Sequence, residues 1–168
     1  MTGDEAAARA RALFLDERHP YGCAETTLLV LREAYGLPGT GTGEAMALNG
    51  GVAYSGGVCG AISGAAIAVG LLAERRCADH AEAKRLARET IAGIIDDFEA
   101  EHGSIDCRTL LGRSIRTPEE HEAFLASDVW RDVCLGQIES VVRRTAELPD
   151  DPRWERASHL TPSSSTGA

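Results

Sequence analysis

Hydrophobic residues recur at helical spacing along most of the chain, and no stretch of useful length alternates apolar and polar residues as a β-strand does. Residues 79–102 show the clearest pattern, with these apolar positions among charged ones: Leu86, Ile91, Ile94, Ile95 and Phe98. Further helices are predicted over residues 4–18, 21–35, 58–75 and 128–147, with shorter helical segments near residues 44–49, 106–111 and 117–120. The sequence therefore predicts an all-α fold, arranged as a compact helical bundle.

Residues 58–75 form the most apolar of the predicted helices, since residues 58–73 carry no charge and are rich in glycine and alanine. We expect this helix to lie at the centre of the bundle. Small residues spaced by three and four give it one smooth face: Gly57, Gly60, Gly64 and Ala68. Glycine inside a helix costs roughly 1 kcal/mol relative to alanine. The pattern therefore favours close approach to another helix, a partner subunit or a cofactor over local stability.

The chain has 168 residues, which suits about one domain. We expect a single helical domain over residues 1–148. Residues 149–168 are rich in proline, serine and charged residues, and such a composition is typical of a polar, flexible tail.

The charge of the chain argues against nucleic acid as a partner, because the net charge is -9 and the arginines are scattered among more numerous acids. Residues 3–11 are polar and lack the apolar segment that export requires, which predicts a cytoplasmic protein. The longest uncharged apolar run, residues 58–73, is shorter than the ~20 residues that cross a bilayer. We therefore expect no membrane span.

Five cysteines carry the most informative chemistry of the sequence: Cys23, Cys59, Cys77, Cys107 and Cys134. They are widely separated, so the chain has no C-x-x-C pair, ferredoxin run or haem-attachment motif. An odd number of cysteines in a cytoplasmic protein argues against a structural disulfide framework. A single buried cysteine most often acts as a small hydrophobic residue. Spacing alone therefore leaves packing, bridging and ligand binding open.

Local context distinguishes four of these cysteines from the fifth. Cys23, Cys59 and Cys107 each lie within the first turn of a predicted helix, where free N–H groups and a partial positive charge favour the thiolate. The thiolate is the form that binds a metal or attacks a disulfide. Cys134 lies on the apolar face of the last predicted helix, whereas Cys77 lies in a charged loop and is expected to be exposed.

Four segments around these cysteines carry a resemblance: YGCAETTLLVLREAYGL, NGGVAYSGGVCGAISGAAIAVGLL, GSIDCRTLLG and VCLGQIESVV. Together they resemble the C_GCAxxG_C_C family of redox-active proteins over residues 21–142, with the four family cysteines in order. That family is similar to the helical part of split-Soret cytochromes, where an iron–sulfur site on four cysteines has been proposed. The resemblance implies a redox domain with a site on Cys23, Cys59, Cys107 and Cys134. Haem is not expected, because the chain has no haem motif.

Three functions are compatible with these cysteines. The first is an iron–sulfur protein whose four thiolates hold one [4Fe–4S] or [2Fe–2S] cluster, with Gly57 and Gly60 letting backbone N–H groups approach its sulfides. Its role would be electron transfer or cluster-based redox or sulfur chemistry. The second is a thiol–disulfide or sulfur-transfer protein that uses the same cysteines as two redox pairs with lowered pKa values. The third is an interaction module with a structural zinc site. Whether the protein is a catalyst is not decided by the sequence.

Other side chains are weaker candidates. His19, His80, His102 and His121 are each more typical of surface positions than of ligands or proton carriers, and Asn49, Tyr54 and Ser55 are candidates for a pocket beside Cys59. No nucleophile triad, Walker loop or dinucleotide motif is present. The small-residue face of residues 58–73 and the alanines of the first helix predict a homodimer. A redox role also implies a redox partner protein.

Overall fold

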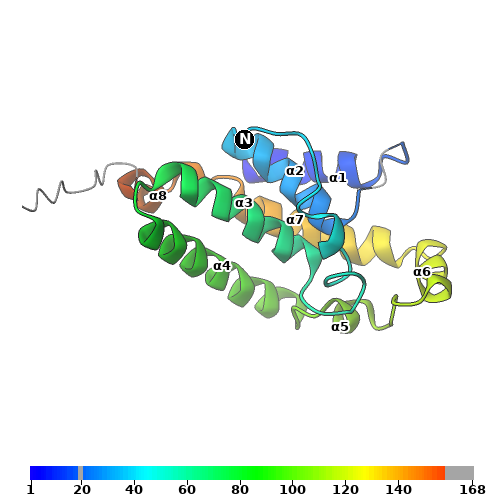
Figure 1. The fold of residues 1–168 in the computed structure, drawn as a ribbon. Coiled ribbons are helices and arrows are strands. Elements are labelled where there is room, and N and C mark those ends of the chain that lie inside the picture. The colour runs from blue at the N-terminus through cyan, green and yellow to red at the C-terminus, as the bar shows by residue number, and fades with distance from the viewer. Residues whose placement is uncertain (19–20, 158–168) are drawn as a thin grey trace, which may run out of the picture.

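The computed structural model describes residues 1–18 and 21–157, and within them the chain forms helices and no β-strand. This confirms the all-α prediction. The longer helices of this part are α1 (Gly3–Phe14), α2 (Cys23–Tyr35), α3 (Gly60–Arg76), α4 (His80–His102) and α7 (Leu135–Thr145). The shorter segments are η1 (Met46–Leu48), α5 (Cys107–Leu111), α6 (Pro118–Leu125), η2 (Trp130–Cys134), η3 (Leu148–Asp150) and α8 (Pro152–Ala157). Figure 1 shows α5 and α6 at one end of the bundle and α8 at the other.

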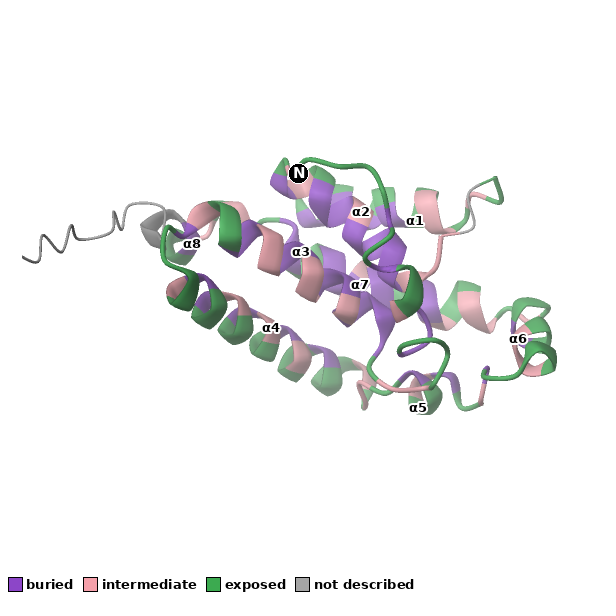
Figure 2. Cartoon of the chain, in the orientation of Figure 1, coloured by how far each residue is buried: buried purple, intermediate pink, exposed green. Residues whose placement is uncertain are grey.

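Helix α3 lies at the centre of the bundle, as the sequence predicts, and contacts α2, α4, α7 and α8. Its inner residues are buried, and Figure 2 shows burial concentrated where α2, α3 and α7 meet. Gly64 permits the close contact with α2, because a Cβ atom there would overlap the carbonyl oxygen of Ala24. The small-residue face is therefore used for packing within the chain.

Helix α1 packs against α7 and α2. It begins with a capping box in which Thr2 and Glu5 exchange hydrogen bonds, so two backbone N–H groups at its start are satisfied. Ala6, Ala7 and Ala10 are buried inside the protein. The sequence assigned the alanines of this helix to a dimer interface, and these three cannot contribute to one, whereas Ala8 and Ala12 are exposed. Dimer formation itself stays a prediction.

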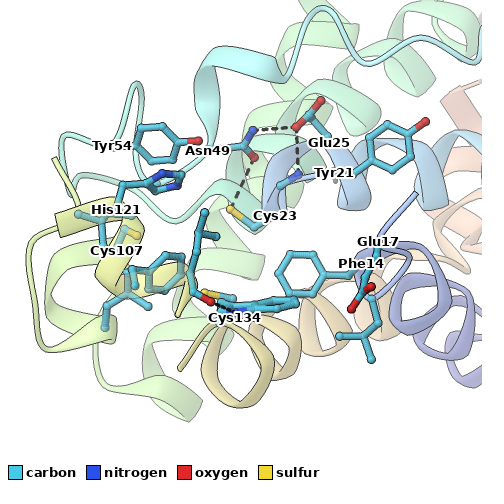
Figure 3. A pocket seen from close by; sticks show the side chains of 18 of the residues that line it. Phe14, Glu17, Tyr21, Cys23, Glu25, Asn49, Tyr54, Cys107, His121 and Cys134 are labelled. Carbon is cyan, nitrogen blue, oxygen red and sulfur yellow. Dashed lines mark hydrogen bonds between the residues drawn. The ribbon is translucent and has the colours of Figure 1, made fainter. Parts of the chain in front are cut away.

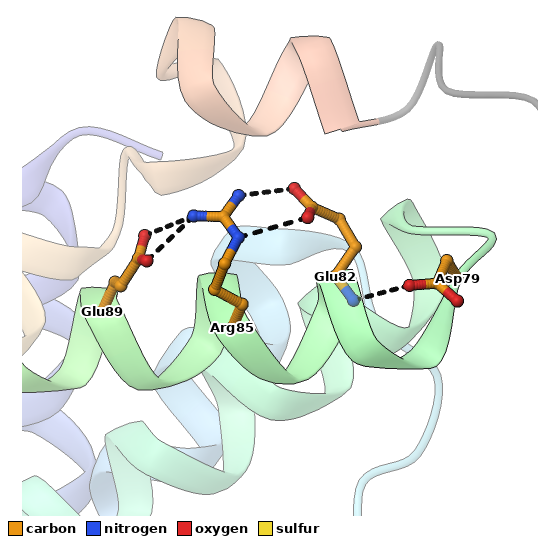
Figure 4. A network of polar contacts seen from close by, with 4 residues as sticks. All are labelled: Asp79, Glu82, Arg85 and Glu89. Carbon is orange, nitrogen blue, oxygen red and sulfur yellow. Dashed lines mark hydrogen bonds and ion pairs between the residues drawn. The ribbon is translucent and has the colours of Figure 1, made fainter.

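Helix α4 runs along the edge of the bundle with one charged face. The Asp79 carboxylate caps its start by accepting from the N–H of Glu82 at 2.8 Å, and Arg85 pairs with Glu82 and Glu89 at 2.6 and 2.7 Å (Figure 4). Such pairs stabilise a helix by about 0.2–0.5 kcal/mol each. Gly103 ends the helix in the left-handed region with φ of 81°, as the sequence predicts.

Three predicted boundaries differ from the structure. The first helix, predicted over residues 4–18, ends at Phe14. Residues 129–145 are helical without a break but are not α-helical throughout, because a π-helical turn, η2, directly precedes α7. The predicted tail begins with η3 and α8, and Trp154 of α8 is fully buried in the main core. An apolar side chain of this size anchors residues 152–157 to α3. Residues 158–168 of the predicted tail lie outside the described residues.

No helix in the described part of the chain combines the length and apolar character needed to cross a membrane.

Candidate functional site

A buried carboxylate organises the start of α2. Glu25 accepts hydrogen bonds from the N–H of Gly22 at 3.0 Å, from the amide of Asn49 at 2.9 Å and from the hydroxyl of Thr42 at 2.8 Å (Figure 3). Because a buried carboxylate is costly unless it is hydrogen-bonded, these donors fix the loop of residues 42–49 against the helix. Gly22 is required here, since a Cβ atom would overlap the Asn49 side chain.

The Cys23 sulfur lies at the N-terminus of α2 in a ring of backbone donors. Burial raises the pKa of its thiol, and the nearby N–H groups of Gly50, Ala24, Cys23 itself and Gly60 offset only part of that effect. The Ala24 N–H donates its hydrogen bond to the Asn49 side-chain oxygen at 3.0 Å. The Asn49 side-chain oxygen accepts from the thiol at 3.8 Å. A Cβ atom at Gly60 would overlap the sulfur, which explains the glycine.

Cys59 and Cys107 are brought together by a short antiparallel pairing of residues 56–59 with residues 105–108. Cys59 donates its N–H to the Ile105 carbonyl at 2.8 Å, and Cys107 donates its N–H to the Gly57 carbonyl at 2.7 Å. Gly57 therefore contributes its carbonyl to this pairing. Cys59 is the N-cap of α3 and Cys107 the first residue of α5, which places both at helix starts, as the sequence predicts.

Cys134 closes the π-helical turn η2 immediately before α7. A π-helical turn carries an extra residue and often occurs at functional sites. Cys134 packs with Cys107 and apolar residues in a second small core, separate from the main one: Leu111, Ile115 and Phe124. Three residues further along, Gln137 accepts a hydrogen bond from the Cys59 thiol at 3.5 Å.

Each of the four thiols has a raised pKa, and burial is the main cause. Burial raises the pKa of Cys59 well above its ordinary value, and the charges of Cys23, Cys107 and Cys134 raise it further. Burial, with the charge of Cys23, raises the pKa of Cys107 to about 12. The pKa of Cys134 is raised in the same way by burial and by Cys23 and Cys107. The sequence expected helix N-termini to favour the thiolates, but burial outweighs that effect.

Cys77 lies apart from this group. The charged neighbours that shift its pKa, after the raising effect of burial, are Glu82, Arg85 and Asp79. The sequence predicted an exposed residue in a charged loop. That prediction is wrong, because Cys77 is the C-cap of α3 and packs into the main core with 8% exposure.

A cavity of about 420 Å³ opens beside the cysteines (Figure 3). Cys23, Cys107 and Cys134 line it, whereas Cys59 is not part of the lining and is 2% exposed.

Asn49 and Tyr54, which the sequence singled out, also line the cavity, and Ser55 instead donates to the Gly51 carbonyl. All five cysteines are free thiols in the structure.

One wall of the cavity is formed by a strained turn. Five consecutive residues have positive φ angles between 50° and 71°: Gly50, Gly51, Val52, Ala53 and Tyr54. Left-handed backbone costs an L-residue roughly 1–2 kcal/mol, and it occurs mostly in single residues. The turn places the Tyr54 ring on His121, with ring centroids 4.5 Å apart. Strain of this kind concentrates at functional sites.

The remaining histidines do not join the cysteines. His80 is the exposed first residue of α4, and His102 packs against Phe98 with ring centroids 4.4 Å apart. His19 lies outside the described residues. Among the residues that the structure describes, no three His, Cys, Asp or Glu side chains are arranged to hold one metal ion.

Comparison with protein-family models gives one match, over residues 21–148, to a family described as "Putative redox-active protein (C_GCAxxG_C_C)". The chain belongs to the C_GCAxxG_C_C family. The matched region contains all four cysteines of the site, and its central motif reads Cys59-Gly60-Ala61-x-x-Gly64 in this family member. Comparisons with curated proteins and with solved structures gave no match.

Three polar residues of this C_GCAxxG_C_C site were not found by sequence reasoning: Glu25, Thr42 and Gln137. Gln137 carries a usable signal, because it is a polar residue three positions after Cys134 on a mainly apolar helix face and is 4% exposed. Glu25 follows Cys23 by two residues at a helix start, a position at which carboxylates commonly stabilise the helix.

Proposed function

We propose that this protein is an iron–sulfur redox protein that holds one cluster on Cys23, Cys59, Cys107 and Cys134. The observation that carries the proposal is geometric: Cys23, Cys107 and Cys134 come from three separate segments and line one cavity, and backbone hydrogen bonds hold the Cys59 segment beside the Cys107 segment. Four thiolates are the ligand number of [2Fe–2S] and [4Fe–4S] clusters. Electron transfer through such a cluster agrees with the family description.

The donor set fits an iron–sulfur cluster on electrostatic grounds. Burial keeps these thiols protonated at neutral pH, and no Lys or Arg side chain is among the described residues that line the cavity. Four thiolates would therefore need compensating positive charge, which bound iron supplies. The burial of these thiols and their raised pKa values therefore support metal binding. Thiols that carry out disulfide exchange are instead exposed and have low pKa values.

The ring of N–H groups around Cys23 supports the same function. Hydrogen bonds from backbone amides to ligand sulfurs stabilise negative charge and tune the reduction potential of a cluster. Gly60 brings one such N–H to the sulfur, and Gly50 brings another from the left-handed turn. A cluster, when bound, supplies one-electron transfer, while these residues hold its ligand and shape its potential.

A single zinc ion is less well supported. Zinc binds thiolates at about 2.3 Å, so four sulfurs must converge tightly on one point. The described side chains show no such convergence of three or more ligands.

The proposal is tested with five single variants in which each cysteine is replaced by alanine. After anaerobic reconstitution with iron and sulfide, we expect at least a fivefold loss of bound iron in each of the variants C23A, C59A, C107A and C134A, because each removes a ligand. Cys77→Ala is the matched control and keeps the iron content of the parent protein, since Cys77 lies outside the site.

Full iron content in any of the four ligand variants would remove that residue from the site. A pairwise pattern of disulfides without iron would replace the proposal with a thiol–disulfide function. One zinc per chain with no iron would replace it with a structural zinc site.

A further inference from the structure

The cavity extends well beyond the sulfur atoms. Figure 3 shows its side chains spread from one end to the other: Tyr54, His121 and Cys107 at one end, Cys23 and Cys134 between, and Phe14, Glu17 and Tyr21 at the far end. The volume of about 420 Å³ lies within the range of small-molecule sites, which is roughly 300–1,000 Å³. The cavity is therefore large enough for an organic molecule.

Aromatic side chains wall this space, and neighbouring groups hold them in place. Trp130 donates its indole N–H to the Leu125 carbonyl at 3.2 Å, and the Phe14 ring meets the Trp130 ring edge-on with centroids 5.6 Å apart. On the other side, Tyr54 stacks on His121, which in turn lies 6.3 Å from the Phe124 ring. Rings fixed before binding offer flat apolar surface at little entropic cost.

The charges of the residues that line the cavity argue against an anionic ligand. Three carboxylates line the cavity, Asp16, Glu17 and Glu25, and no Lys or Arg does so among the described residues. Glu25 is held in its own hydrogen bonds, and Asp16 pairs with Arg18 at 2.9 Å. Glu17 is exposed at the far end. Arg131 does not line the cavity, but its guanidinium lies over the Trp130 ring, 4.7 Å from the ring centroid. An anion in the cavity would therefore lose its hydration without a cation in the lining, whereas a cation can lie on the remaining aromatic faces.

We propose that this cavity binds a small, flat aromatic molecule that is uncharged or cationic, seated between the aromatic walls and beside the Cys23 sulfur. A role of this molecule as a redox substrate rests on the proposed iron–sulfur function. Its binding rests on the cavity alone.

The binding test uses three probes of one shape and different charge: 2-naphthol, a 2-naphthyltrimethylammonium salt and 2-naphthoate. Titration calorimetry of the full chain near neutral pH, with and without reconstituted iron, measures each affinity. We expect the neutral and cationic probes to bind and 2-naphthoate to bind at least tenfold more weakly. Equal affinity for 2-naphthoate, or no binding of the neutral and cationic probes, would overturn the inference.

Two variants locate the site. Leu125 lines the cavity and is 55% exposed, so Leu125→Trp fills the space from the rim without disturbing a core. Met46 is 62% exposed and is not part of the lining, which makes Met46→Trp the matched control. We expect at least tenfold weaker binding of 2-naphthol in the first variant and unchanged binding in the second. Unchanged binding in Leu125→Trp would overturn the inference.

Iron content separates this inference from the proposed function. Protein that binds iron but none of the probes would overturn the inference and leave the proposed function standing. Protein that binds 2-naphthol with the expected charge preference but takes up no iron would overturn the proposed function and support the inference.

Discussion

The sulfur of Cys23 is the point at which three segments of the chain meet. Cys23 itself belongs to α2, and backbone N–H groups lie near its sulfur at Gly50 of the left-handed turn and at Gly60 of α3. Each segment can approach only because the residue at the contact is small or has a permissive backbone. The packing around the Cys23 sulfur therefore depends on the glycines that contact it. Replacing one of these glycines is the most direct test of this packing.

Replacement of Gly60 by alanine places a Cβ atom against the Cys23 sulfur and 3.1 Å from the Ala24 nitrogen. We expect loss of at least half of the bound iron and a free energy of unfolding lower by about 1–3 kcal/mol, because overpacking forces the helices apart. Gly70→Ala in the same helix is the control, since nothing lies within 4 Å of the added atom. An iron assay measures the first effect and urea unfolding the second. Unchanged iron content and stability in Gly60→Ala would contradict the close contact between Gly60 and the Cys23 sulfur.

The raised thiol pKa values give the protein prepared without iron a pH dependence. Burial, with the charge of Cys23, raises the pKa of Cys107 from 9.0 to about 12 in the folded chain, so the folded state keeps a proton that the unfolded state loses. This stability is fully present below about pH 9 and is lost as the pH rises toward about 12. Urea unfolding in reductant between about pH 7 and about pH 10.5 should show the decline. A flat profile would argue against buried protonated thiols.

At the scale of elements, the strained turn over residues 50–54 stands out. Gly50 and Gly51 adopt positive φ angles readily, but Val52, Ala53 and Tyr54 do so at a cost. Hydrogen bonds from Ala53 to the Ala47 carbonyl at 2.7 Å and from Tyr54 to the Asn49 carbonyl at 3.2 Å hold the turn in place. Tertiary contacts compensate for the cost of the positive φ angles. They hold Gly50 near the Cys23 sulfur and Tyr54 in the cavity wall.

Relief of this strain should stabilise the protein. Ala53 is exposed, so Ala53→Gly removes no packing and allows the positive φ angle of 51°. We expect the free energy of unfolding to rise by about 0.5–1 kcal/mol. Ala92 is also exposed but lies in the middle of α4, where Ala92→Gly should lower the free energy of unfolding by about 1 kcal/mol. Chemical unfolding compares the two, and equal losses would show that the turn is not strained.

These elements differ in how far the sequence predicts them. Thr117, Pro118 and Glu120 form the predicted capped start of α6, because a capping box acts through residues close in sequence. The left-handed turn and the π-helical turn before Cys134 were not predicted. Both are unfavourable locally and persist through long-range contacts, which the periodicity of hydrophobic residues does not report. The burial of Trp154 was not predicted for the same reason. Trp154 is a single apolar residue in a polar segment, and its side chain is nevertheless buried in the core.

At the scale of the whole molecule, the bundle gathers its chemistry at one end. Cys23 comes from α2, Cys59 from the start of α3, Cys107 from α5 and Cys134 from η2, and the pairing of residues 56–59 with 105–108 ties two of these segments together. The family resemblance predicted one site on these four cysteines and set Cys77 apart, and that shared site stays a prediction. The sequence did not predict the buried environment that raises their pKa values, because burial depends on how all the helices pack.

The central claim, that these four cysteines hold an iron–sulfur cluster, is tested most directly by the iron and acid-labile sulfide content of the wild-type chain prepared without oxygen. The account predicts brown protein with matching amounts of iron and sulfide, two or four of each per chain, and a broad visible absorption that dithionite bleaches. Colourless protein that contains neither iron nor sulfide after anaerobic reconstitution would contradict it.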